Sequence, residues 1–247
     1  RSGHNASTLP NHCHVIVHRA IAIEEVCYAK TTVAVASTMV ATIDIGKIAL
    51  EPGSRITIPD VDWREFETIL QALGDSRNSR IAYSHKTLEI MVPLPDHERS
   101  KVLISDIVKI LLRHQGRDWE SLGSTTFRGQ LKAIGVEPDD CFYIANYQAV
   151  IGKSRLDLTI DPPPDLAIES DYTSKTKLDA YIALQVPELW IYDRGLKIYV
   201  IQGDRYLEVE TSPTFPGLPL KDTVVQVIQQ AKTVGSSRAL RAFEATL

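Results

Sequence analysis

Carboxylates gather in two short stretches that could bind a metal ion. Residues 137–140 contain Asp139 and Asp140, and the apolar run 165–168 ends in Glu169. Carboxylate oxygens at the ends of neighbouring strands are the hard ligands that Mg²⁺ and Mn²⁺ prefer. Such an ion polarises a phosphodiester and lowers the pKa of a bound water. The pattern therefore indicates metal-assisted hydrolysis of a phosphate ester.

Each stretch also has a simpler structural explanation. Pro-Asp pairs are common in turns, so Asp139 can be an ordinary loop residue. Glu169 lies at the end of a buried strand, where an unpaired charge is costly. A salt bridge to a lysine or arginine would satisfy Glu169 as well as a metal ion would. Composition and spacing leave both explanations open.

The hydrophobic pattern predicts the elements that position these carboxylates. Apolar residues at helical spacing predict helices that begin after Asp62, at Asp96, at Thr173 or Ser174, and at Thr223. Strands are predicted over 81–84, 87–92, 119–122, 125–128, 141–144, 156–160, 165–169, 188–193, 196–202 and 206–209. This alternation favours the α/β fold class, with a buried central strand and an antiparallel edge.

Helical geometry distinguishes two lysines that follow Glu169. If the helix begins near Ser174, Lys177 shares a face with Tyr181, and that face turns toward the sheet. Lys175 lies on another face, where it is exposed. We therefore predict that Lys177, and not Lys175, extends toward the end of the strand that carries Glu169.

Four ordered blocks of the sequence resemble the Uma2 family of endonucleases. The blocks are residues 93–98, residues 137–144, residues 161–169 followed by Lys177 and Tyr181, and residues 186–193. The resemblance covers roughly residues 45–230. The resemblance implies the PD-(D/E)XK nuclease fold, which is a restriction-endonuclease-like mixed central sheet flanked by helices. It also implies a requirement for Mg²⁺ or Mn²⁺.

The resemblance assigns catalytic roles to three residues. Asp139 and Glu169 match the metal-binding carboxylates of the family. The parent motif has a lysine two residues after the glutamate, but Asp171 stands there in this chain. The family is similar to nucleases whose lysine has moved to the following helix, which implies Lys177. That substitution is where this chain departs most from the motif.

Four further residues are auxiliary candidates near the metal. They are His97, Glu98, Asp140 and Asp171. The first two match the start of the family's core helix, where related nucleases keep an extra carboxylate. A solvated helix start would explain both equally well.

The leading hypothesis is a metal-dependent endonuclease that hydrolyses DNA phosphodiester bonds. The alternative is a catalytically inactive nucleic-acid-binding module on the same fold, because Asp171 replaces the motif lysine and fold does not settle function. A hydrolase of small phosphate esters is disfavoured, since the sequence has no phosphate-binding glycine-rich motif. A homodimer is compatible with cleavage of both strands.

Bulk properties set the remaining expectations. The 247 residues suggest one domain plus an appendage, and the net charge of −4 leaves room only for a local basic surface. Three unpatterned cysteines favour a cytoplasmic protein. No run approaches the roughly 18 apolar residues of a membrane helix, so no membrane partner is expected.

Three segments are expected along the chain. Residues 1–36 form a disordered or non-native extension, 45–232 the nuclease domain, and 233–247 a C-terminal tail. The first segment also holds a set of potential zinc ligands, namely His12, Cys13, His14 and His18. Their adjacent side chains project in different directions, which disfavours a zinc site.

Overall fold

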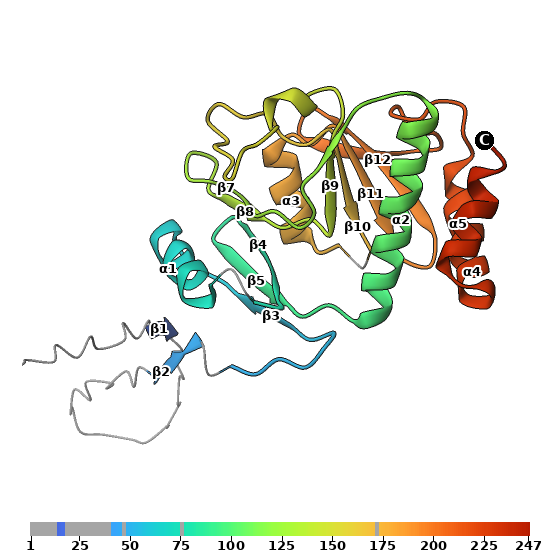
Figure 1. Cartoon of the computed structure of the whole chain (residues 1–247). Coiled ribbons are helices and arrows are strands. Elements are labelled where there is room, and N and C mark those ends of the chain that lie inside the picture. Colours follow the sequence, from blue (N-terminus) through green and yellow to red (C-terminus); the bar gives the residue numbers. More distant parts are fainter. Residues whose placement is uncertain (1–13, 18–40, 46–47, 75–76, 171–172) are drawn as a thin grey trace, which may run out of the picture. The chain divides into compact units, whose positions relative to one another are not determined.

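The computed structural model describes residues 14–17, 41–45, 48–74, 77–170 and 173–247 (Figure 1). The chain divides into two units, one of residues Arg1–Ala49 with Arg64–Arg77 and the other of Leu50–Trp63 with Asn78–Leu247. In the first unit, β1 (His14–Val17) pairs antiparallel with β2 (Ala41–Asp44). Helix α1 (Trp63–Leu73) buries Phe66, Ile69 and Leu70, the helical spacing that the sequence predicts.

Within the described residues, a six-stranded sheet forms the centre of the second unit, in the order β13-β12-β11-β10-β9-β6. Its strands are β6 (Glu120–Ser121), β9 (Asp140–Tyr143), β10 (Leu166–Glu169), β11 (Glu188–Tyr192), β12 (Leu196–Gln202) and β13 (Arg205–Val209). Strands β10 and β11 are parallel, and the other pairs are antiparallel. The predicted mixed sheet is confirmed.

A second sheet in this unit is antiparallel throughout, with the order β3-β5-β4-β8-β7. Its strands are β3 (Arg55–Ile58), β4 (Arg80–Ser84), β5 (Thr87–Met91), β7 (Phe127–Gly129) and β8 (Ile134–Val136). The β4–β5 hairpin matches the prediction. Strands β3 and β8 are too short for their alternation to stand out in the sequence.

Helices cover both faces of the six-stranded sheet (Figure 1). They are α2 (Pro95–His114), α3 (Lys175–Leu184), α4 (Leu220–Val234) and α5 (Ser236–Glu244), with a short 3-10 helix at Tyr147–Ala149. Side chains alternate across β10: Leu166 and Ile168 pack in the cluster with α2, α4 and α5, whereas Ala167 packs in the cluster with α3. None of the helices in the described part of the chain is long and apolar enough to cross a membrane.

Two expectations differ from the structure. Residues 156–160 form turns instead of a strand, because Asp157 accepts hydrogen bonds from the amides of Thr159, Ile160 and Asp161. Residues 233–247 are not a tail: they contain α5, which buries Ala239 and Phe243 in the core. That helix is short, and two buried residues four apart are a weak periodic signal.

Candidate active site

Asp139 directly precedes β9, and Glu169 ends the neighbouring antiparallel strand β10. The last register pair is Asp140 with Ile168, so Asp139 and Glu169 come next at the same end of the two strands. The amide of Asp139 donates to the carbonyl of Ile168 at 3.0 Å, which holds Asp139 beside β10. The charge of Asp139 acts to raise the pKa of Glu169, and Lys177 acts to lower the pKa of both carboxyls. The ends of the two strands therefore bring the two predicted metal ligands together.

Helix α3 supplies both partners of Glu169. Lys177 Nζ donates to Glu169 Oε2 at 2.7 Å, and Tyr181 Oη donates to Oε1 at 2.5 Å. The Ser174 hydroxyl caps the helix by accepting from the Lys177 amide, which sets where the helix begins. Glu169 and Lys177 are only 1% and 7% exposed, whereas Lys175 is exposed. The predicted orientation of Lys177 is confirmed.

Ser170 holds the second carboxylate. Its amide and its hydroxyl both donate to Asp139 Oδ2, at 2.7 and 2.6 Å. Asp139 is 5% exposed, so these bonds replace water that the carboxylate would otherwise bind.

Burial and charge act in opposite directions on these groups. Burial raises the pKa of Glu169 to about 7, against the opposing effect of Lys177. Burial also acts to raise the pKa of Asp139, but the charge of Lys177 and the Ser170 hydrogen bonds outweigh it, and the pKa is lowered. Desolvation disfavours the Lys177 ammonium, but the two carboxylates outweigh it and raise its pKa. A buried ammonium thus lies beside two carboxylates.

Glu98 organises two cations near this centre. Its carboxylate lies 2.6 Å from Lys101 Nζ and 3.8 Å from Arg80 Nη2. Lys101 helps to lower the pKa of Asp139, although burial and Lys177 act on that carboxyl more strongly. The auxiliary candidate Glu98 is therefore engaged with basic residues. His97 lines a different pocket, together with Ser170 and other residues.

Asp140 has different hydrogen-bond partners from Asp139. Its Oδ2 accepts from Ser105 of α2 at 2.5 Å, and its Oδ1 accepts from the Ser121 hydroxyl and the Cys141 amide. The structure therefore separates this auxiliary candidate from Glu169, whose hydrogen-bond partners come from α3. Asp171, the other auxiliary candidate, lies outside the described residues.

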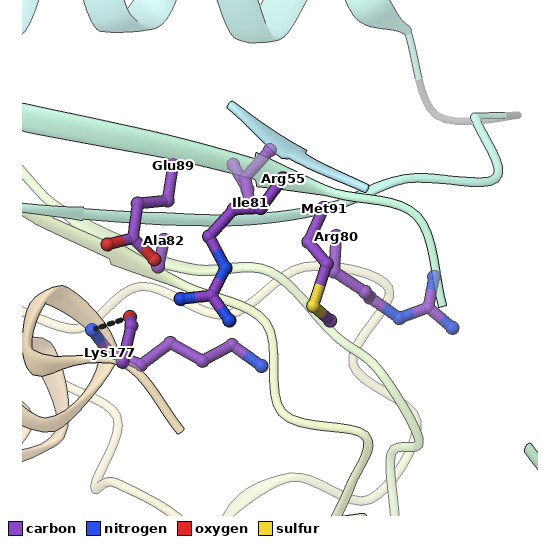
Figure 2. Close-up of a pocket in the computed structure, with 8 residues that line it drawn as sticks. Arg55, Arg80, Ile81, Ala82, Glu89, Met91 and Lys177 are labelled. Carbon is purple, nitrogen blue, oxygen red and sulfur yellow. Dashed lines mark hydrogen bonds between the residues drawn. The ribbon is translucent and has the colours of Figure 1, made fainter. Parts of the chain in front are cut away.

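A pocket with basic walls adjoins Lys177 (Figure 2). Arg55 comes from β3, Arg80 from β4 and Glu89 from β5, while Lys177 comes from α3. Figure 2 shows the Arg55 guanidinium and the Lys177 ammonium pointing into the same space, with Glu89 beside them and the Arg80 guanidinium turned away. The buried lysine that bonds Glu169 thus also lines a pocket that contains two arginines.

A family model for Uma2, described as "Putative restriction endonuclease", matches residues 63–231. The chain belongs to the Uma2 family. One solved structure that it resembles is that of "a putative nuclease belonging to DUF820" from Anabaena variabilis ATCC 29413. The sequences are 17% identical, the match covers 59% of this chain and 89% of that chain, and the TM-score is 0.41. Comparison with curated proteins gives no match.

The donors in this Uma2 protein suit a hard divalent ion. Among the described residues, no group of three or more His, Cys, Asp or Glu side chains is arranged to hold a metal. Mg²⁺, however, commonly binds through one or two carboxylates and keeps several waters. Asp139 Oδ1 accepts no hydrogen bond within the described residues, so it is available as a ligand near Glu169. The two carboxylates fit Mg²⁺ or Mn²⁺.

Three residues of this Uma2 site were not predicted from the sequence. Ser170 stands between the glutamate and the expected lysine of the motif, and a hydroxyl at a buried strand end could have drawn attention to it. Lys101 and Arg80 give no such signal, because only the packing of α2 and β4 brings them near Asp139 and Lys177.

Proposed function

We propose that this Uma2 protein is a metal-dependent endonuclease that hydrolyses phosphodiester bonds in DNA. The observation that carries the proposal is the buried hydrogen bond of 2.7 Å between Lys177 and Glu169. Through this bond, helix α3 places a lysine beside the motif glutamate, although Asp171 stands at the motif's own lysine position. Strongly perturbed ionisable groups gathered in this way are typical of catalytic sites.

The residues divide the chemistry among them. Asp139 and Glu169 would hold Mg²⁺ or Mn²⁺, which when bound polarises the phosphate and lowers the pKa of a water ligand. Lys177 places a positive charge where negative charge develops on the phosphate oxygens. That charge acts more strongly in a buried site than it would in bulk water. Tyr181 and Ser170 keep the carboxylates oriented through their hydrogen bonds.

Nucleic acid is the substrate class that the family and the basic pocket support. Arg55 and Arg80 extend the positive surface beyond Lys177, and cations of this kind contact backbone phosphates. Specificity for DNA, a homodimeric assembly and a cytoplasmic location stay predictions from the sequence.

A binding module without turnover is the second candidate. Two observations favour it: Asp171 replaces the motif lysine, and both oxygens of Glu169 already accept hydrogen bonds from α3. A metal ion at Glu169 would have to share or displace one of these donors. In this alternative the cluster of Asp139, Glu169 and Lys177 would stabilise the fold, and the basic pocket would bind nucleic acid.

A plasmid assay separates the two functions. Purified protein is incubated with supercoiled DNA and Mg²⁺, Mn²⁺ or EDTA, and a gel shift without metal measures binding. We expect nicked and linear products with either ion and none in EDTA. Binding without cleavage in either metal would support the module, and neither binding nor cleavage would contradict both functions.

A further inference from the structure

Two donors of Ser170 converge on one oxygen of Asp139. The amide and the hydroxyl both bind Oδ2, and Ser170 is itself buried. Two charge-assisted hydrogen bonds to one oxygen hold that oxygen firmly in place. Within the described residues, Oδ1 is left as the oxygen without a hydrogen bond.

The neighbouring carboxylate shows the opposite arrangement. Asp140 also binds a buried serine, Ser105, at 2.5 Å. However, its second oxygen accepts from Ser121 and from the Cys141 amide, so both oxygens are engaged. Both oxygens of Asp140 are engaged by structural donors, whereas Asp139, whose charge acts on Glu169, keeps one oxygen without a hydrogen bond among the described residues.

We propose that Ser170 is a positioning residue that directs Asp139 Oδ1 toward a divalent cation held with Glu169. This inference rests on the proposed function, because it requires the metal site. Ser170 lies inside the motif, and in this role its hydroxyl orients a metal ligand in addition to stabilising the end of the strand. A carboxylate bound by one oxygen is a common ligand mode for Mg²⁺ and Mn²⁺.

Binding of Mn²⁺ to the full chain without DNA tests this role. Electron paramagnetic resonance of free Mn²⁺ gives the dissociation constant without reference to cleavage. We expect Ser170→Ala to weaken Mn²⁺ binding by about 10- to 100-fold, the usual effect of losing a group that orients a metal ligand. Ser170→Thr, which keeps the hydroxyl, should stay within about threefold of the parent.

Ser105→Ala is the matched control, since it removes the same kind of bond on the opposite face. We expect Mn²⁺ affinity within about twofold of the parent, because Asp140 is not a ligand. If Ser170→Ala does not fold, Ser170→Cys replaces it, and its weaker donor should still reduce affinity by about threefold or more.

Each outcome has a defined meaning. Unchanged affinity in the folded Ser170 variants would overturn the inference, as would equal losses in Ser105→Ala. A parent that binds no Mn²⁺ would refute the metal site and the inference with it. A parent that binds Mn²⁺ in a Ser170-dependent way but cuts no DNA would uphold the inference and refute only the nuclease function.

Discussion

The two ends of the parallel β10–β11 pair each bury a glutamate, and the surroundings of the two differ. Glu169 ends β10 and is 1% exposed, whereas Glu188 begins β11 and is 2% exposed. Glu169 accepts from a lysine and a tyrosine. Glu188 accepts from the Trp190 indole at 2.6 Å and from the amide and hydroxyl of Thr214 at 3.1 and 2.6 Å.

The difference separates a structural carboxylate from a candidate catalytic one. Neutral donors satisfy Glu188 and tie β11 to the turn before α4, which stabilises the fold. At the other end a second carboxylate, Asp139, faces Glu169 beside a buried cation. Replacing a buried ion pair by apolar residues is often neutral or stabilising. The buried pair is therefore weak evidence for a stabilising role, and the proposed metal-dependent chemistry would give it a function.

The largest expected effect comes from exchanging each glutamate for glutamine. Glu169→Gln should lower metal-dependent plasmid cleavage by at least about 100-fold, because it removes a charged metal ligand. Glu188→Gln should leave cleavage within about threefold, and its unfolding free energy should fall by about 1–3 kcal/mol in urea titration. Equal losses of activity in the two variants would remove the distinction between the two ends.

Lysine exchange on α3 tests whether the cation is catalytic. Lys177→Met keeps the apolar stem and removes the charge, and we expect a loss of about 30- to 1000-fold in kcat, or roughly 2–4 kcal/mol. Lys175→Met alters an exposed residue and should stay within about threefold. A cleavage time course with saturating Mn²⁺ compares the two. The reverse ranking would move the catalytic lysine to the other position.

Metal should stabilise the Glu169 end of the strand pair. At about 100 times the dissociation constant, Mn²⁺ should raise the unfolding free energy by about 2.7 kcal/mol. Asp139→Asn should abolish this gain and Asp140→Asn should keep it, because only the first carboxylate faces Glu169. Thermal unfolding with Mn²⁺ and with EDTA measures both. Stabilisation that survives Asp139→Asn would place the metal elsewhere.

The smallest effect is expected from removing residues 1–36. Both ends of the β10–β11 pair belong to the unit of residues 50–63 and 78–247, so neither glutamate should be affected. The cleavage rate should match that of the full chain. The unfolding midpoint should match to within about 2 °C, which corresponds to roughly 0.5–1 kcal/mol. Aggregation of the shortened chain would show that the segment supports the core.

Local patterns in the sequence determined much of the candidate site. A short apolar run followed by Glu169 indicated a buried strand end, and the spacing of Lys177 and Tyr181 indicated one helix face. Both conclusions depend only on the repeat of a strand or a helix, which neighbouring residues set among themselves. The confirmed orientation of Lys177 follows from that local geometry and from the cap at Ser174.

Tertiary structure decided which groups meet. Asp139 and Asp140 are neighbours in the sequence, but the packing of α3 and α2 gives them different partners. Asp139 interacts with the charge of Lys177 from α3, and Asp140 accepts a hydrogen bond from Ser105 of α2. The Glu98 contacts with Lys101 and Arg80 likewise join residues of α2 and β4. Residues 156–160 carried an extended pattern, yet local hydrogen bonds to Asp157 turned the chain. Periodicity assigns side chains to a face, whereas long-range packing decides what that face meets.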